Sequence, residues 1–356
     1  MLHRDSYENY GAVLTEKMQV IHPLLPDATR PFWSVMIPTY KPRADYLEET
    51  LKSVLQQDPG PGQMQIEVLD DGSPNGAPVE LVRRLADDRV SVHREPANNG
   101  LAGIWNRCIE RARGEWVHIL HQDDIVLPGF YDHLYRGIGC NPQAGMAFCR
   151  FAISDANGHW KELAPLERST PGVLDGWLER VATDCRVQCP AVVVRRATYE
   201  QLGGFRADLV SVLDIEMWVR IAANFPVFYE PQILAFFRRH GTNQSVMDER
   251  TGANMQDMAR AIEVWKDYFP AHCREQLEQQ SRRYWSGIAL MLAQIFFSNE
   301  DVVACTSQLR AAKTLWNHGR HRSRRLRLEA KVLLHRVLGE RAISAMREVR
   351  RRIRPA

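Results

Sequence analysis

Short apolar segments alternate with helix-like patterns through the first third of the chain. Apolar runs that suit buried strands recur at 33–38, 65–70, 90–94 and 115–120. Segments with apolar residues three and four positions apart lie between them, at 45–57, 77–88 and 101–113. Because a strand–helix–strand order sets successive strands side by side in one direction, the pattern predicts an α/β domain with a mostly parallel sheet flanked by helices.

The pattern continues, less regularly, to about residue 250. A helix is expected over 128–138, with Pro128 near its start, and another after Asp214. Further strands are expected at 145–153, 189–195, 226–231 and 233–239. From about residue 251 the pattern is helical to the end of the chain, so an all-helical region should follow the sheet.

Composition fits a folded protein of more than one domain. The 356 residues are 45% hydrophobic and 25% charged, which excludes an intrinsically disordered chain and allows a sizeable core. We predict an N-terminal extension over 1–31, an α/β domain over 32–250 and a helical C-terminal region with a basic amphipathic tail over 251–356.

The cysteines and the apolar segments indicate a cytoplasmic protein. Seven cysteines, an odd number without metal-type spacing, are expected to be reduced thiols. The first ten residues lack the apolar stretch of a secretory signal. The longest apolar run, at 287–297, is shorter than the ~20 residues that a membrane-spanning helix needs. We therefore expect no segment that crosses a membrane.

The C-terminal tail has a charge opposite in sign to that of the rest. From Arg320 to Arg354 there are 13 Lys and Arg residues against three acids, while the remainder has 33 against 40. Apolar residues recur there at helical spacing, at 330, 334, 337, 338, 342, 345, 346, 349 and 353. Such a helix either lies on an anionic membrane surface, such as the inner face of the cytoplasmic membrane, or packs on the body. No base-reading module accompanies it, so nucleic acid is not an expected partner.

Three predicted strands end in unusually polar loops, at 38–42, 70–75 and 121–124. The carboxyl ends of parallel strands meet at one edge of a sheet, and ligands bind outside that edge. The side chains that should approach one crevice are Thr39, Tyr40, Asp71, Asp123 and Asp124. Each has a purely structural alternative, as a turn, cap or packing residue, but their convergence favours a binding site.

The adjacent carboxylates of Asp123 and Asp124 repel each other unless a cation holds them. Hard oxygen ligands favour Mg²⁺ or Mn²⁺. Zinc is disfavoured, because His118 lies within a predicted strand and no further His or Cys is close to His121. No glycine-rich dinucleotide or P-loop motif is present, so neither redox chemistry with a dinucleotide nor P-loop phosphoryl transfer is indicated.

Six sequence strings resemble the inverting nucleotide-sugar glycosyltransferases of family 2, which have the GT-A fold. In family order they are VMIPTYKP, EVLDDGSPN, the segment from NNGLAGIWN to HQDDIVLPGFY, LGGF, VLDIEMWVRI and FFRRHGTNQS. Together they span about residues 32–246 and leave the C-terminal third uncovered. The resemblance implies a nucleotide-sugar donor and a divalent metal.

The resemblance also implies roles for residues at the donor end. Pro38, Thr39 and Tyr40 match the loop that contacts the base and ribose. Asp71 matches the acid that hydrogen-bonds a pyrimidine, which favours UDP or dTDP. HQDD matches the metal motif, although His121 stands where the family commonly has Asp. The resemblance leaves open which of Asp123 and Asp124 ligates the metal and which contacts the ribose.

The remaining strings imply the catalytic and diphosphate-binding residues. Asp214 matches the catalytic base, with Glu216 as the second choice, and the alternative for Asp214 is a helix N-cap. His240 matches a residue that completes the metal shell, the alternative being an ordinary loop histidine. Arg238 or Arg239 is expected near the diphosphate. In this scheme the base deprotonates an acceptor hydroxyl while the metal and arginines stabilise the leaving diphosphate.

We expect an inverting, metal-dependent glycosyltransferase that acts on a saccharide or lipid-linked acceptor in cell-surface polysaccharide synthesis. The alternative is a catalytically inactive relative that binds nucleotide sugar or membrane as an assembly partner. The histidine at position 121 is the feature that favours the alternative.

Overall fold

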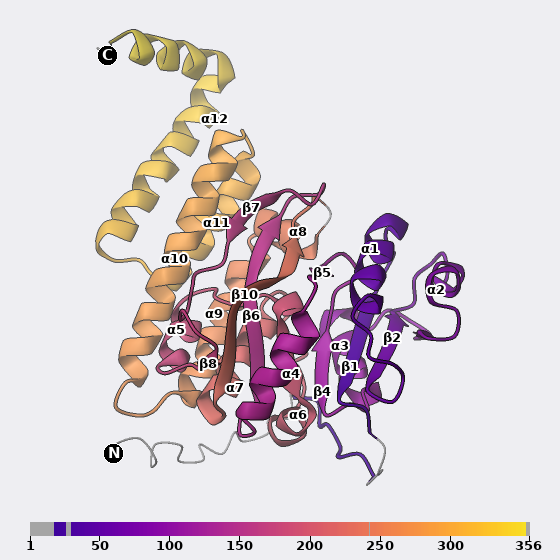
Figure 1. Ribbon diagram of the computed structural model, residues 1–356. Helices are drawn as coiled ribbons and strands as arrows, with labels where there is room; N and C mark the ends of the chain where they lie inside the picture. Colours follow the sequence, from indigo (N-terminus) through magenta and orange to yellow (C-terminus); the bar gives the residue numbers. More distant parts are fainter. Residues whose placement is uncertain (1–17, 26–29, 242, 354–356) are drawn as a thin grey trace.

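The computed structural model describes residues 18–25, 30–241 and 243–353, with side chains described up to Val337 (Figure 1). The strands are β1 Trp33–Thr39, β2 Met64–Asp70, β3 Ser91–Arg94, β4 Trp116–Ile119, β5 Ile125–Val126, β6 Met146–Ser154, β7 Trp160–Leu163, β8 Gly172–Val173, β9 Val192–Arg195 and β10 Val227–Arg238.

The helices that flank the sheet are α1 Ala44–Leu55, α2 Val79–Ala86, α3 Gly100–Arg111, α4 Phe130–Cys140, α5 Trp177–Thr183, α6 Arg196–Leu202 and α7 Leu213–Asn224. The C-terminal helices are α8 Gln244–Thr251, α9 Ala253–Trp265, α10 Arg274–Ser298, α11 Val302–Leu315 and α12 Gly319–Ile353, with 3₁₀ turns at Cys189–Ala191 and Lys266–Tyr268.

One mixed sheet runs through the described residues in the order β3-β2-β1-β4-β9-β6-β10-β5, with β7 beside β6 and β8 beside β10. Strands β3, β2, β1 and β4 are parallel, as are β6 and β10, and the antiparallel strand β9 joins the two groups. The predicted α/β fold with a mixed sheet and a following helical region is therefore confirmed. The two strands predicted at 226–231 and 233–239 are one strand, β10, whose pairing with β6 is irregular between Glu230 and Ala235.

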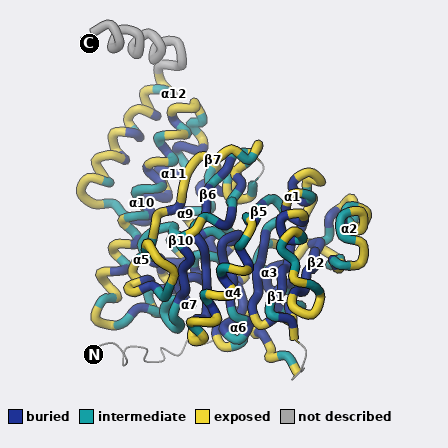
Figure 2. The backbone as a smooth tube through the Cα atoms, viewed as in Figure 1, coloured by how far each residue is buried: buried dark blue, intermediate teal, exposed yellow. Residues whose placement is uncertain are grey.

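Both faces of the sheet are buried, which explains why its strands are continuously apolar in the sequence. In β1, Val35 and Ile37 pack into one core and Met36 into the other, because successive side chains point to opposite faces. The C-terminal helices contribute to the core that contains Met36. Trp265 of α9 and Leu290 of α10 belong to it. Buried residues accordingly run through the sheet and into these helices (Figure 2).

The ends of the chain differ in how they join this body. Of the predicted extension, Ile21 is buried, while residues 1–17 lie outside the described part. The all-helical part begins at Gln244, and the domain boundary at residue 251 stays a prediction. Within the described residues, no helix has both the length and the apolar character needed to cross a bilayer.

Candidate active site

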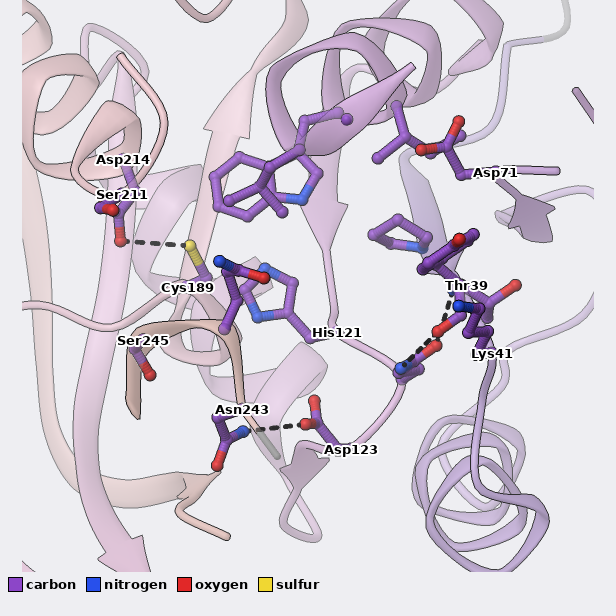
Figure 3. Close-up of a pocket in the computed structure, with 18 of the residues that line it drawn as sticks. Thr39, Lys41, Asp71, His121, Asp123, Cys189, Ser211, Asp214, Asn243 and Ser245 are labelled. Atoms are coloured by element: carbon purple, nitrogen blue, oxygen red, sulfur yellow. Dashed lines mark hydrogen bonds between the residues drawn. The ribbon is translucent and has the colours of Figure 1, made fainter. Parts of the chain in front are cut away.

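A cavity of about 700 Å³ lies outside the carboxyl ends of β1, β2 and β4, a size suited to a small-molecule ligand. The start of α7 and the segment around α8 form its opposite wall (Figure 3). Of the predicted site residues, the cavity is lined by Pro38, Thr39, Tyr40, Asp71, Asp123, Asp214 and His240. The parallel strands thus bring together the loops that the sequence analysis grouped.

The loop after β1 is held to both neighbouring loops. Gln122 accepts a hydrogen bond from Tyr40 N at 2.9 Å and donates one to Tyr40 O at 3.3 Å. Lys41, with a positive φ of 48°, donates its backbone N–H to Ser73 Oγ at 2.8 Å. Tyr40 is 39% exposed and lines the cavity, where its ring can offer a flat apolar surface.

Asp71 follows β2 and is almost completely buried. One of its carboxylate oxygens, Oδ1, accepts hydrogen bonds from Asn99 N at 2.8 Å and from Asn99 Nδ2 at 3.0 Å. Gly72 has φ +67°, and a Cβ there would lie 2.7 Å from the carbonyl carbon of Ala97. The Asp-Gly pair therefore packs the loop after β2 against the start of α3 while its carboxylate borders the cavity.

Asp123 is held by two side chains from beyond β10. Its Oδ2 lies 2.8 Å from His240 Nε2 and accepts a hydrogen bond from Asn243 Nδ2 at 3.1 Å. All three residues line the cavity. The structure thus joins the HQDD loop to the RRHG loop at this carboxylate.

Asp124 points into the protein instead. Its Oδ1 accepts a hydrogen bond from Arg238 N at 2.9 Å, and its Oδ2 lies 3.4 Å from His121 Nδ1, long for a hydrogen bond. Burial raises the pKa of Asp124 to about 6, although His121 partly offsets this. Burial lowers the pKa of His121, but Asp124 and Asp123 outweigh that effect and raise it overall. The two side chains form an acid–imidazole pair in which Asp124 is buried and His121 lines the cavity.

The residues fit a divalent cation. Single ligand atoms from His121, Asp123 and Asp124 all lie within 4.8 Å of one another. Asp124 Oδ2 and His121 Nε2 are buried without a hydrogen-bond partner, an arrangement that a bound ion or water would satisfy. Oxygen-rich donors with imidazole suit Mn²⁺, and carboxylates alone suit Mg²⁺. His118 lies elsewhere, buried between Tyr131 Oη at 3.0 Å and Pro190 O at 3.1 Å.

Asp214 lies in the first turn of α7 and faces the cavity from the wall opposite Asp71 (Figure 3). Its Oδ1 accepts the Ile215 N–H at 2.8 Å, and Cys189 Sγ lies 3.7 Å from its Oδ2. Burial raises the pKa of Asp214, and the Ile215 N–H partly opposes this. Burial also raises the pKa of the Cys189 thiol well above its usual range, so the thiol stays protonated and donates to the carboxylate.

A carboxylate from the C-terminal region holds the three residues that lead into α7. Asp257 of α9 accepts the backbone N–H groups of Val210, Ser211 and Val212 at 2.8, 2.7 and 3.2 Å. Asp257 is only 1% exposed. Asp214 is the second residue of α7 and not its N-cap; although its Oδ1 accepts the Ile215 N–H, the side chain lines the cavity.

Glu216 does not line the cavity, contrary to its choice as the second candidate base. It is fully buried, where Oε2 accepts a hydrogen bond from Arg220 Nη2 at 2.8 Å and Oε1 accepts one from Tyr268 Oη at 2.8 Å. Two residues after Asp214, a helical side chain points about 200° around the axis, so Glu216 faces the core.

The structure also does not bring Arg238 and Arg239 to the cavity wall. The Arg238 guanidinium pairs with Glu49, lies 4.3 Å above the Tyr46 ring and donates to Asp123 O at 3.0 Å. Arg239 pairs with Glu249 at 2.9 Å on the surface. Arg238 therefore positions the HQDD loop, and the cations that line the cavity are Lys41 and Arg43.

Several cavity residues lay outside the predicted set. They are Lys41, Arg43, Asn98, Trp105, Gln122, Gln188, Cys189, Ser211, Asn243, Gln244, Ser245 and Asp248, among others. Trp105, expected in the core, is buried and also stacks on His121, with ring centroids 5.0 Å apart. Gln122 and Asn98 lie within motifs that the sequence analysis quoted, whereas nothing in the local pattern marks Cys189 or Asp248.

Comparison with known proteins agrees with this geometry. The family model of glycosyl transferase family 2 matches residues 34–199. An uncharacterized protein of Mycobacterium tuberculosis is 27% identical over 65% of this chain and 75% of its own length. A putative teichuronic acid biosynthesis glycosyltransferase of Bacillus subtilis, TuaG, is 38% identical, over 27% of this chain and 37% of its own length.

Two solved structures have a similar fold. Residues 1–349 of Staphylococcus aureus TarS in complex with UDP-GlcNAc align with a TM-score of 0.61 at 15% identity, over 86% of this chain and 92% of that one. The mannosyltransferase PcManGT of Pyrobaculum calidifontis, in complex with GDP-Man and Mn²⁺, aligns with a TM-score of 0.51 at 20% identity, over 85% and 91%. The family model thus matches residues 34–199, just under half of the chain, and the mixed sheet with the cavity at its strand ends has the GT-A type fold of these two structures.

Proposed function

We propose that this protein transfers a sugar from a nucleoside diphosphate donor, UDP or dTDP, to a hydroxyl of a saccharide or lipid-linked acceptor with inversion. One observation carries the proposal: a single cavity has Thr39 and Asp71 at one end, the Asp123–His240 pair in its wall and Asp214 at the other end. That order matches what a transfer needs, which is a nucleotide site, a diphosphate site and a base.

The nucleotide is assigned to the end formed by Pro38, Thr39, Tyr40 and Asp71. The exposed Tyr40 ring suits stacking on a base, and a carboxylate such as Asp71 accepts the imino N–H of uracil or thymine. Lys41 borders the same end and supplies positive charge for the diphosphate, a role that Arg238 and Arg239 cannot fill from their ion pairs.

Asp214 is assigned as the base. It takes the proton of the acceptor hydroxyl while that oxygen bonds to the anomeric carbon, and the bond from this carbon to the diphosphate oxygen breaks on the opposite face. The raised pKa of the buried carboxyl makes it a better proton acceptor than an exposed aspartate. A divalent cation, Mg²⁺ or Mn²⁺, held by His121, Asp123 and Asp124, with His240 beside Asp123, would neutralise the leaving diphosphate.

The biological setting is proposed from the relatives. The putative teichuronic acid biosynthesis enzyme of Bacillus subtilis supports a role in cell-surface polysaccharide synthesis. Donors of this class are used in the cytoplasm, so we infer a cytoplasmic enzyme with peripheral contact to the inner face of the membrane, where lipid-linked acceptors lie.

A catalytically inactive, donor-binding assembly partner is the second candidate. His121 favours it, because an imidazole stacked on Trp105 and paired with Asp124 stands where the family commonly has a carboxylate. An imidazole in place of a carboxylate lowers the negative charge that binds a metal ion. The residues that line the nucleotide end of the cavity are not affected by it.

Thermal stabilisation by UDP-, dTDP- and GDP-sugars, with and without Mn²⁺, tests donor binding, and product analysis by NMR tests transfer and anomeric configuration. We expect metal-dependent stabilisation by UDP or dTDP donors and an inverted product. Stabilisation without transfer or donor hydrolysis across the panel would support the inactive candidate. No stabilisation by any nucleotide sugar would overturn both.

A further inference from the structure

Helix α12 leaves an apolar stripe exposed on the surface. Its contacts with the body use Arg325, Leu328 and Val332, which are buried. Leu333 and Val337 are 64% and 71% exposed, on a different side of the helix. The described part of the tail therefore packs on the body through only one side of the helix. Its other apolar side chains are exposed to solvent.

The exposed stripe is continuous along the helix axis. Its members, which follow one another at spacings of four, three and four residues, are Leu326, Ala330, Leu333 and Val337. Basic side chains lie on both sides of it, Arg322 on one side and Arg327 and Lys331 on the other, all of them exposed. An apolar stripe between basic borders is typical of helices that lie in a membrane interface.

A groove between α11 and α12 adjoins this stripe. It is a cavity of about 230 Å³ lined by Thr306, Leu309, Arg310, Glu329, Val332, Leu333 and Arg336. Arg336 Nη2 donates a hydrogen bond to Thr306 Oγ1 at 3.3 Å, and Glu329 is engaged by Arg325. The groove thus sets two guanidinium groups, those of Arg310 and Arg336, beside the apolar side chain of Leu333, a combination suited to a phosphate headgroup and its first methylenes.

The placement of α12 also relates it to the active site. The helix rises past the body at the end of the molecule where β1 and β2 finish, the edge outside which the cavity lies (Figure 1).

We propose that the exposed stripe of α12 and the adjoining groove dock on an anionic phospholipid bilayer. Charge complementarity selects this occupant over a second copy of the chain, since two copies of so basic a surface repel each other. Docking deepens the membrane contact of the proposed function by naming the surface that makes it, and it does not depend on the transferase reaction, so each can fail without the other.

Co-sedimentation of the full chain with vesicles tests the proposal. Vesicles of phosphatidylcholine with 30% phosphatidylglycerol are compared with pure phosphatidylcholine at low and high salt. We expect the protein to sediment with the anionic vesicles only, and 0.5 M NaCl to release most of it. Changing Arg322, Arg327 and Lys331 to Gln should lower the partition coefficient about a hundredfold, since each basic residue contributes about fivefold. Leu333→Ser with Val337→Ser should lower it at least tenfold.

Helix α2 offers a matched control, because it also exposes an apolar residue and arginines. The triple variant Val79→Ser, Arg83→Gln, Arg84→Gln should bind vesicles like wild type. Circular dichroism establishes that every variant is folded, and the exposed positions make a fold defect in all three unexpected. Equal binding to both vesicle types, unchanged binding of both α12 variants, or a self-association that the stripe variant abolishes without vesicle binding would each overturn the proposal.

Discussion

Asp123 Oδ2 lies 2.8 Å from His240 Nε2, although 117 residues separate them in the chain. The contact joins the loop after β4 to the loop after β10, and Asn243 supports it at 3.1 Å. By contrast, the neighbouring Asp124 turns inward to Arg238 N. The two adjacent aspartates thus have different environments, one at the cavity and one behind it.

This difference predicts separable effects on metal binding. Asp123→Asn should lower the affinity for Mn²⁺ in the presence of UDP at least tenfold, because a cavity-facing carboxylate is lost. Asp124→Asn should lower that affinity less, since Asp124 does not line the cavity and its Oδ1 already accepts the Arg238 N–H, which leaves only Oδ2 for the ion. Isothermal titration with Mn²⁺ measures both, and wild-type affinity in the Asp123 variant would contradict the assignment.

The base assignment predicts a loss of turnover without a loss of binding. Asp214→Asn should lower kcat by about 10²- to 10⁴-fold, as expected for removal of a general base, while UDP affinity stays within a factor of two. Glu216→Gln is the contrasting variant. Because it breaks a fully buried pair with Arg220, it should lower the unfolding free energy by about 3 kcal/mol. Turnover retained in the Asp214 variant would remove it as the base.

The contact between Asp257 and the start of α7 predicts a role for the C-terminal region in catalysis. Asp257→Ala leaves three backbone N–H groups without their acceptor, so kcat should fall more than KM for the donor changes, with a stability loss of about 3 kcal/mol. Asp257→Asn keeps an acceptor oxygen and should restore much of kcat. The exposed Asp267→Asn serves as the control and should resemble wild type. An alanine variant with full kcat would show that α7 needs no such support.

His118 predicts a pH dependence of stability. Burial lowers its pKa from 6.5 to about 3, so between these values the unfolded chain binds a proton that the folded chain does not. The contribution of His118 to the free energy of unfolding is complete above pH 6.5. As the pH falls from 6.5 towards 3, it is lost by about 1.4 kcal/mol per pH unit. Urea unfolding at pH 5 and 7 measures the difference, which should shrink in His118→Gln. If the free energy of unfolding changed equally between pH 5 and 7 in both proteins, His118 would not be the source of the pH dependence.

The parallel half of the fold was predictable because its signals are local. Apolar runs and helical spacing located β1 to β4 and α1 to α3 to within a few residues. The antiparallel placement of β9 was not predictable, since strand direction in a mixed sheet depends on partners distant in sequence. The single strand β10 escaped prediction because Pro231 interrupts its local pattern, whereas the sheet tolerates the irregularity there.

The sequence predicted which residue types form the site and at which edge of the sheet they lie. It did not predict the side chains with which they form hydrogen bonds and ion pairs. Local sequence could not reveal that Glu49 and Tyr46 hold Arg238, or that Tyr268 and Arg220 hold Glu216, because these contacts form only on packing. The same reason applies to the α12 stripe, whose exposure depends on which side of the helix meets α11.

The sequence by itself determined the order of strands and helices, the polar loops at one sheet edge and the basic amphipathic character of the tail. These properties follow from spacing along the chain and from the common direction of parallel strands. Only the tertiary structure decided which acid faces the cavity, which carboxylate supports the helix of Asp214 and which side of α12 stays exposed. In each case, packing against segments that lie tens to hundreds of residues away in the chain determines which of several neighbouring side chains has the role.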